Sequence, residues 1–549
     1  MYDYVVVGGG SAGCVVAARL SEDPAVRVCL LEAGPDDTSP LVHVPVGALA
    51  TVPRKLFNWA YESVPQPGLK GRRGYQPRGK VLGGSSCINA MIYIRGHRWD
   101  YDHWASLGNP GWSYDEVLPY FLKAEHNERG ADAWHATGGP LNVTDLRSPS
   151  PVGGLFIEAA KQSGYAYTPD FNGASQEGVG PYQVTQVGGE RCSAAQAYLR
   201  PIRNRPNLNI ITDAHATRVI FEGKRAVGVE YRRGGRVSVA KASREVVLSG
   251  GAFGSPQLLM LSGIGRAEHL SGLGIPVVHD LPGVGQNLQE HPDYIMLYKS
   301  PSKDVLGITP SGVMHAMREW RRYQKERTGM FTSNFAEAGG FIKSDPHLAI
   351  PDLQWHFVIG MVEDHARKVR FGYGYSCHVC ILRPKSRGEV TLASRDPYAN
   401  PLIDMGYYRD ESDLDAMVKA FKITRKVMEA PALAPVRGEE QVTKHLRSDD
   451  EIRDIIRSRG DGIYHPVGTC KMGNDPMAVV DAELRVHGIE GLRVVDASIM
   501  PTLIGGNTNA PAIMIGEKAA DMIKQAATTP SFLNVANPAT RRETSEATA

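Results

Sequence analysis

The sequence predicts an α/β protein of two domains: a parallel-sheet domain that is discontinuous in the chain, and an α+β domain with an antiparallel sheet. Three observations support this prediction. A strand, glycine turn, helix and strand pattern opens the chain at residues 2–34, and a strand, turn and helix pattern closes it at residues 491–523. Between them, residues 300–446 carry alternating strand-like runs and one helical run, which indicates a separate domain.

The domain boundaries follow from this division, because 549 residues are too many for one core. We expect the first domain over residues 1–148, 190–299 and 449–526, and the second over residues 149–189 and 300–448. Residues 527–549 are polar and rich in Thr, Ala and Pro, which is typical of a disordered tail.

The opening segment predicts a Rossmann-like dinucleotide fold. YVVV is an apolar strand, CVVAARL has helical apolar spacing, and VRVCLLE is a second strand. In the GxGxxG motif between strand and helix, Gly8 permits the tight turn, Gly10 lets the backbone approach a pyrophosphate, and Gly13 packs the helix on the strand. Glu32 ends the second strand, where its carboxylate can accept hydrogen bonds from ribose hydroxyls and would repel the 2′-phosphate of NADP. The expected site also includes the flanking Ser11, Ala12 and Ala33.

Charge and cysteine content exclude several classes of protein. The 61 basic and 59 acidic side chains nearly cancel, so no overall field favours nucleic acid. Seven scattered cysteines favour a reducing compartment, and Cys470 has no CxxC partner, so no metal site is expected. Because no secretory signal or bilayer-spanning run is present, we expect a cytoplasmic protein, with peripheral attachment to the inner face of the cell membrane left open.

Two later segments again predict a strand, a turn and a helix. They are VHDLPGVGQNLQEHP (Val278–Pro292) and the run from Gly491 to Ile523. The second is the more informative, because its GGNTN turn lies between a buried strand and an amphipathic helix. A turn of this kind presents backbone N–H groups to a ligand.

Three further stretches carry a recognisable pattern: GKVLGGSSCINAMIYIRG (79–96), GAFGSPQLLMLSGIG (251–265), and the pair YHPVGTCKMG and GGNTNAP. With the N-terminal motif, the chain from residue 2 to about 525 resembles the glucose-methanol-choline (GMC) oxidoreductases. Within this family it is similar to bacterial dehydrogenases that oxidise medium-chain aliphatic alcohols during alkane oxidation, and it is also choline dehydrogenase-like.

The resemblance implies FAD as the cofactor, held by the first domain, and a substrate-binding role for the second. Relatives with covalent FAD carry a histidine where this chain has Ile88, so non-covalent FAD is expected. Beyond the glycine turn, the resemblance implies these cofactor-binding residues: Gly79, Gly83, Gly84, Ser85, Asn89, Ala90, Met91, Ala216, Asp496, Ala497, Thr508 and Asn509.

His465, in DGIYHPVGTCKMG, matches the catalytic histidine of the family. An imidazole with a pKa of about 6.5 is largely neutral at pH 7 and can accept the alcohol proton. Asn507 matches the second catalytic position; an amide cannot act as the base, so Asn507 is expected to hydrogen-bond the substrate oxygen. The pocket is expected to be apolar and roofed by the second domain, with walls from Tyr464, Trp355, Phe357 and Phe335.

The function implied is FAD-dependent oxidation of primary, medium-chain aliphatic alcohols to aldehydes, with a hydride passing to flavin N5 and electrons passing on to a quinone-type acceptor. Several alternatives remain open at this point. They are an oxygen-using alcohol oxidase, a choline- or polyethylene glycol-type dehydrogenase, a non-redox flavin lyase or decarboxylase of the same fold, and a catalytically silent dinucleotide-binding module. The sequence does not indicate an oligomeric state.

Overall fold

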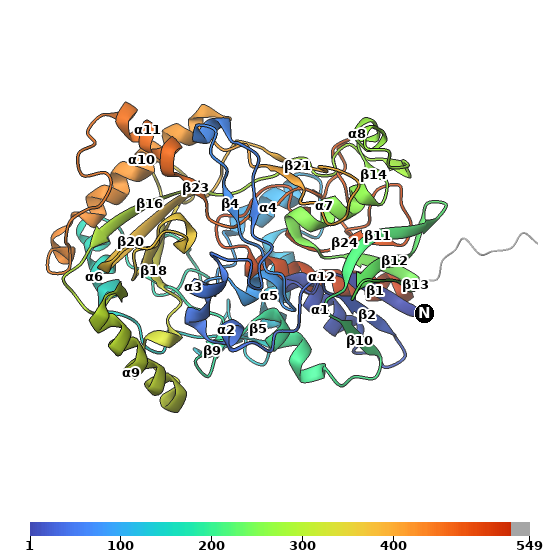
Figure 1. Cartoon of the computed structure of the whole chain (residues 1–549), viewed down its shortest axis with the longest axis horizontal. Coiled ribbons are helices and arrows are strands. Elements are labelled where there is room, and N and C mark those ends of the chain that lie inside the picture. The colour runs from blue at the N-terminus through green and yellow to red at the C-terminus, as the bar shows by residue number, and fades with distance from the viewer. Residues whose placement is uncertain (529–549) are drawn as a thin grey trace, which may run out of the picture.

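A seven-stranded sheet carries the N-terminal βαβ unit in the computed structural model, which describes residues 1–528 (Figure 1). Its strands follow the order β10 (Leu208–Ile211), β2 (Val28–Leu31), β1 (Tyr2–Val7), β13 (Arg236–Leu248), β12 (Arg225–Arg233) and β11 (His215–Glu222), with β24 (Leu492–Val494) beside β13. The strands β10, β2, β1, β13 and β24 are parallel to their neighbours, whereas β12 and β11 continue the sheet in antiparallel fashion. The sheet is therefore assembled from both ends of the chain, as predicted.

A second seven-stranded sheet forms the other lobe, on the left of Figure 1. Its order is β23 (Asp461–Gly462), β16 (Pro292–Lys299), β20 (Gly372–Ile381), β19 (Leu353–Val358), β18 (Ala336–Ile342) and β7 (Gly178–Pro181), with β17 (Gly307–Ile308) beside β20. Every pairing in this sheet is antiparallel, which confirms the predicted α+β lobe.

Helices cover both sheets. They are α1 (Ser11–Leu20), α2 (Pro40–His43), α3 (Ala48–Thr51), α4 (Arg98–Ser106), α5 (Tyr114–Ala124), α6 (Pro151–Gln162), α7 (Gly251–Leu261), α8 (Ala267–Gly272), α9 (Pro310–Glu326), α10 (Glu411–Met428), α11 (Asp449–Arg459) and α12 (Asn509–Thr528). Small two-stranded sheets are β3 (Tyr61–Glu62) with β4 (Tyr75–Gln76), β5 (Glu125–Asn127) with β6 (Leu141–Val143), β8 (Gln186–Val187) with β9 (Glu190–Arg191), β14 (Ile264–Gly265) with β15 (His279–Asp280), and β21 (Glu389–Thr391) with β22 (Leu402–Asp404). α1 packs against α12, so the first and last helices of the described chain lie together in one core.

Three elements of the two lobes cross the predicted domain boundaries. β16 belongs to the second sheet, although residues 292–299 were assigned to the first domain, and β23 joins it from the C-terminal segment. α12 continues to Thr528, beyond the predicted domain end at residue 526. The remainder of the predicted tail, residues 529–549, lies outside the described residues, and the division into domains stays a prediction.

The helix predicted within Val278–Pro292 is wrong. After β15, the backbone N–H groups of Leu288 and Gln289 donate to the carbonyls of Gly388 and Val467, at 3.0 Å each, instead of forming an i to i−4 ladder. Tertiary bridges to these distant segments hold the loop extended and override its local apolar spacing.

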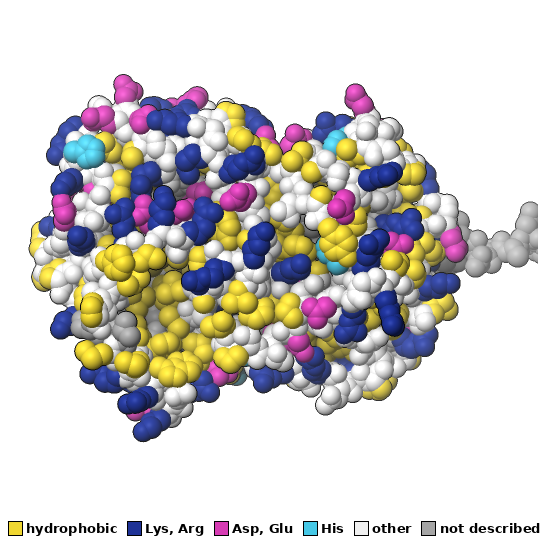
Figure 2. All heavy atoms as spheres, in the orientation of Figure 1, with side chains coloured by type: hydrophobic (Ala, Val, Ile, Leu, Met, Phe, Trp, Pro, Cys, Tyr) yellow, Lys and Arg dark blue, Asp and Glu magenta, His cyan; other side chains and the backbone are white. Residues whose placement is uncertain are grey.

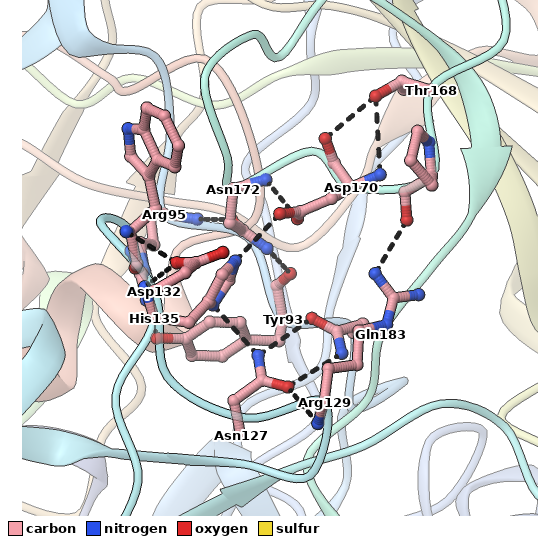
Figure 3. A network of polar contacts seen from close by, with 12 residues as sticks. Tyr93, Arg95, Asn127, Arg129, Asp132, His135, Thr168, Asp170, Asn172 and Gln183 are labelled. Atoms are coloured by element: carbon pink, nitrogen blue, oxygen red, sulfur yellow. Dashed lines mark hydrogen bonds and ion pairs between the residues drawn. The ribbon is translucent and has the colours of Figure 1, made fainter.

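A network of polar contacts around His135 joins the segments near residues 95, 127–135 and 168–172 (Figure 3). His135 lies between two carboxylates, with Nδ1 3.1 Å from Glu125 Oε1 and Nε2 2.8 Å from Asp170 Oδ2, and Arg95 pairs with Glu125 at 2.8 Å. Burial opposes the charged imidazole, but the bonds to Asp170 and Glu125 outweigh it and raise the pKa of His135 to about 9. Its stabilising contribution is therefore complete below the ordinary pKa of about 6.5 and is lost as the pH rises through about 9.

Candidate active site

The glycine turn after β1 has the geometry predicted for each glycine. Gly8 has a φ of +100°, and a Cβ there would lie 2.4 Å from the Ser249 carbonyl oxygen. A Cβ on Gly13 would lie 1.9 Å from the Gly8 oxygen, so α1 packs directly on the turn. The Cβ position of Gly10 is open, with the Ser249 oxygen 3.9 Å away as its nearest neighbour, and this open side lines a cavity.

Glu32 closes the other side of this turn at the end of β2. Its carboxylate oxygens accept the Gly9 N–H at 2.8 Å and the Gly34 N–H at 2.7 Å. Burial raises the pKa of Glu32 to about 7, and these two N–H donors lower it only in part. Further hydroxyl donors at the carboxylate would favour its ionised form, so the site suits ribose hydroxyls. Ala33 and Ala216 line the cavity beside Glu32.

The segment from Gly79 to Met91 forms the next stretch of cavity wall. Most of its predicted cofactor residues line the cavity: Gly79, Gly84, Ser85, Asn89, Ala90 and Met91. Gly83 does not, because a Cβ there would meet Cys87 Sγ at 2.5 Å in the protein interior. The absence of side chains at Gly83 and Gly84 lets this segment pack on the glycine turn, where a Gly84 Cβ would lie 2.7 Å from Gly10 Cα.

The C-terminal cofactor residues complete the wall. Asp496, Ala497, Thr508 and Asn509 all line the cavity. Asn509 begins α12, and its Oδ1 accepts the Ser11 hydroxyl at 2.7 Å, which ties the start of α12 to the start of α1. Two helix N-termini thus meet at the cavity, a favourable place for the phosphates of a dinucleotide. The glycine cradle, Glu32 and these helix ends together fit FAD.

One cavity of about 430 Å³ extends from the glycine turn to the predicted catalytic pair. His465 and Asn507 both line it, and Asn507 Nδ2 lies 3.2 Å from His465 Nε2. His465 follows β23, and Asn507 precedes α12, so the meeting of the two side chains depends on the packing of the two lobes. Their catalytic roles stay proposals.

Two of the four predicted pocket walls are wrong. Phe335 and Tyr464 line the cavity, whereas Trp355 and Phe357 lie on the opposite face of β19. There Trp355 Nε1 donates to Thr424 Oγ1 at 2.8 Å, and Phe357 stacks on Phe156 at 4.7 Å. Side chains alternate along a strand, and α6 and α10 cover this face, so both aromatic rings are core residues.

The residue between those two aromatics, His356, was missed. It faces the cavity, and its Nε2 lies 3.5 Å from Asn507 Nδ2. A lone polar residue between two aromatics on a strand-like run is the sequence signal that could have found it.

Glu290 and His291, which the sequence did not indicate, form hydrogen bonds with His465. Glu290 Oε1 accepts the backbone N–H of His465 at 2.7 Å and that of His291 at 2.9 Å, and His291 Nδ1 lies 3.1 Å from His465 Nδ1. The possible ligand atoms of these three side chains lie within 4.8 Å of one another, a grouping that sequence spacing did not reveal. The two Nδ1 atoms are hydrogen-bonded to each other, and Glu290 Oε1 accepts two backbone N–H groups, so these three possible ligand atoms already have partners within the protein.

The electrostatics keep this histidine cluster neutral. Burial lowers the pKa of His465 well below its ordinary value, and His291, His356 and Arg78 lower it further. Burial is also the main cause that lowers the pKa of His291 and of His356 to about 3. Burial raises the pKa of Glu290 to about 8, opposed in part by Arg78. A neutral His465 is free to accept a proton.

Comparisons with known proteins agree with this arrangement. Models of the GMC oxidoreductase family match residues 2–293 and 384–516. The chain is 50% identical to an alcohol dehydrogenase (acceptor) of Pseudomonas putida, over 95% of this chain and 96% of the relative. It is 47% identical to mitochondrial choline dehydrogenase of Homo sapiens, over 95% and 90% of the two chains.

A solved structure gives the same fold and cofactor. Formate oxidase of Aspergillus oryzae, studied for its FAD modification, superposes with a TM-score of 0.89 at 28% identity, over 96% of this chain and 98% of the other. The glycine cradle, the paired helix N-termini and the cavity that ends at His465 are what such a cofactor requires. This chain therefore belongs to the GMC oxidoreductases, a family of FAD-dependent enzymes.

Proposed function

We propose that this protein oxidises primary, medium-chain aliphatic alcohols to aldehydes with non-covalent FAD. The observation that carries this proposal is the pairing of His465 with Asn507 at 3.2 Å, in the cavity that begins at the glycine turn. The relatives from Pseudomonas putida and Homo sapiens, which are named for alcohol and choline oxidation, support the class of substrate.

His465 acts as the proton acceptor for the alcohol hydroxyl. Its imidazole is neutral at pH 7, because burial and the neighbouring His291 lower its pKa. Asn507 Nδ2 lies 3.2 Å from His465 Nε2. When the alcohol binds between these two side chains, Asn507 donates an amide N–H to the substrate oxygen and so orients the hydroxyl toward His465. When bound, FAD supplies the two-electron acceptor for the hydride that leaves the alcohol carbon.

The end of the cavity near His465 favours an aliphatic chain over a cationic substrate. Its walls there are mainly apolar, from Ile92, Phe335, Val358, Val362, Ile463 and Tyr464. Recognition of a quaternary ammonium group requires a carboxylate or an aromatic cage. Among the described residues that line the cavity, the carboxylates are Glu32 and Asp496, both at the nucleotide end. The lack of a carboxylate at the His465 end among these residues favours an aliphatic alcohol over choline as the substrate.

A chain-length series tests the substrate. From ethanol to 1-octanol, kcat/KM is expected to rise about fourfold per methylene, since each buried CH₂ contributes about 0.8 kcal/mol. Choline should be a poor substrate in the same assay. A flat chain-length dependence, or a preference for choline over 1-octanol, would contradict the aliphatic assignment.

We further propose a quinone-type electron acceptor, and the same assay tests it. With 1-octanol as donor, reduction of a soluble quinone analogue should exceed peroxide formation in air. Peroxide formation at the faster rate would instead identify an oxygen-using oxidase.

We also propose that the protein is cytoplasmic and attaches to the inner face of the membrane through α9. None of the helices within residues 1–528 has the length and apolar character needed to span a bilayer. α9 instead exposes Met314, Met317 and Trp320, by 65%, 57% and 36%, next to the exposed Arg321 and Lys325. Figure 2 shows hydrophobic side chains gathered around a hollow on this face, where Figure 1 places α9. Exposed apolar and basic side chains on one helix are typical of a helix that binds to an anionic lipid surface.

Vesicle sedimentation tests this attachment. The Arg321→Gln variant is expected to bind phosphatidylglycerol vesicles about fivefold more weakly, because one basic residue near an anionic surface contributes about 1 kcal/mol. Arg236→Gln, an exposed arginine on β13 in the other lobe, is the matched control and should bind as the wild type does. If the wild-type protein stays in the supernatant both with phosphatidylglycerol vesicles and with phosphatidylcholine vesicles, membrane attachment is excluded.

A further inference from the structure

His291 makes two hydrogen bonds that together connect a backbone carbonyl to the proposed base. It is fully buried behind His465. Its Nε2 lies 3.0 Å from the Ile504 carbonyl oxygen, and its Nδ1 lies 3.1 Å from His465 Nδ1.

The partner atoms determine which ring nitrogens carry hydrogen. A carbonyl oxygen only accepts, so His291 Nε2 must carry the hydrogen of that bond. A neutral imidazole has one N–H, and burial keeps His291 neutral, so its Nδ1 is an acceptor. The bond between the two rings then requires that His465 carries its hydrogen on Nδ1. The lone pair of His465 therefore lies on Nε2, which faces Asn507.

A second, independent chain of hydrogen bonds leads to the same result from the opposite side. The Tyr182 hydroxyl donates to the Trp355 carbonyl at 2.5 Å and accepts from Gln354 Nε2 at 3.3 Å. Gln354 Nε2 also donates to Asn507 Oδ1 at 3.0 Å. The amide of Asn507 is thereby oriented with Nδ2 toward His465, and an N–H donor at this position requires a lone pair on His465 Nε2.

We propose that His291 is a positioning residue that fixes His465 in the Nδ1–H tautomer and so presents the Nε2 lone pair to the alcohol. This inference rests on the proposed function, because it matters only if His465 is the base. In the opposite tautomer, Nε2 would offer a hydrogen to the substrate hydroxyl and could not accept its proton. The bond made by the distal ring nitrogen selects the tautomer of a functional histidine.

Glu290 holds the backbone of His291 and of His465 in positions that allow the hydrogen bond between their rings. Its Oε1 accepts the backbone N–H groups of both histidines, so the loop before β16 and the segment after β23 share one anchor. The other charged or titratable groups that act on His465 are His356 and Arg78. Neither of these two makes a hydrogen bond to His465 among the described residues, so His291 is the side chain that determines the state of Nδ1.

Two amide variants separate the two ends of the His291 ring. The Oδ1 of His291→Asn can occupy the position of Nδ1 and accept from His465, whereas the amide of His291→Gln reaches the position of Nε2 and serves only Ile504. We expect His291→Asn to lower the rate of flavin reduction by 1-octanol by at most about tenfold, the effect of one imperfect hydrogen bond. His291→Gln should lower it by about 10²-fold or more, the lower end of what a positioned base contributes. Both variants should retain FAD.

Nitrogen-15 NMR of histidine-labelled holoenzyme provides a readout that packing alone would not change. The wild type should show an unprotonated Nε2 for His465, with its signals assigned by their loss in His465→Gln, and His291→Gln should shift the tautomer population. A wild-type His465 with hydrogen on Nε2 would overturn the inference, as would wild-type activity in His291→Gln. If His291→Gln fails to fold, the wild-type spectrum and the His291→Asn rate decide. Activity retained in His465→Ala would instead refute the proposed function itself.

Discussion

The His465→Ala variant is expected to reduce its flavin with 1-octanol about 10²–10⁴-fold more slowly than the wild type, the range that a positioned general base contributes. His465 is the neutral imidazole that shares the alcohol site with Asn507, and removing it leaves an amide that cannot take up the proton. Stopped-flow measurement of flavin reduction checks the chemical step without the later electron acceptor.

Two controls isolate this effect. FAD content and Tm should stay near wild-type values, because His465 lies at the far end of the cavity from the glycine turn. The His347→Ala variant removes an exposed histidine on a loop and should turn over normally. A His465→Ala holoenzyme with full activity would mean that another group is the base.

The pH profile of the wild type follows from the same residue. Burial, and then His291, His356 and Arg78, hold the pKa of His465 well below 6.5. A base with a lowered pKa stays deprotonated as the pH falls through 6.5, so kcat/KM should fall only in more acidic solution. Folding stability should decline as the pH falls from about 6.5 toward the lowered pKa of His465, because over that interval the unfolded chain binds the proton more readily than the folded chain does. An acid limb of kcat/KM with its midpoint at or above pH 6.5 would contradict this assignment.

The Gly10→Val variant is expected to fold but to lose FAD. Gly10 has a φ of −82°, which valine can adopt, and its Cβ position points into open space beside the Ser249 oxygen at 3.9 Å. The added side chain would occupy the cavity at the start of α1, where the pyrophosphate is expected. Purified protein should therefore lack the flavin absorption, and the alcohol activity should disappear with it.

Two other glycines distinguish loss of the cofactor from loss of the fold. Gly13→Val would place its Cβ 1.9 Å from the Gly8 oxygen and should yield unstable protein. Gly154→Ala lies on the exposed side of α6, with no atom within 4 Å of its Cβ, and should behave as the wild type does. Gly10→Val protein that binds FAD stoichiometrically would show that the dinucleotide does not approach this turn.

Most of the predicted cofactor residues line one cavity, and the sequence could indicate them because their signals are local. Gly8, Gly10, Gly13 and Glu32 lie within one βαβ unit, where covalent spacing fixes their positions relative to strand and helix. The resemblance to the GMC family then supplied His465 and Asn507. Gly83 is an exception, because it packs inward against Cys87 and does not line the cavity.

The second lobe shows where sequence reasoning failed. Trp355, His356 and Phe357 are consecutive, and their alternation on a strand was predictable. The sequence could not show which of these side chains face the cavity, because that depends on α6 and α10 covering the opposite face of the strand. The aromatic rings therefore lie in the core, and the histidine lies in the site.

By itself, the sequence determined the α/β class, the dinucleotide turn and the family, since each depends on residues at short, fixed separations. Only the tertiary structure brought His291 and Glu290 to His465, across separations of 174 and 175 residues. The apolar residues of the segment that contains His291 and Glu290 have a spacing that favours a helix. Backbone hydrogen bonds to Gly388 and Val467 nevertheless hold this segment extended. Contacts between distant segments, rather than local propensity, decide such a loop, and with it the hydrogen bond that determines the state of the proposed base.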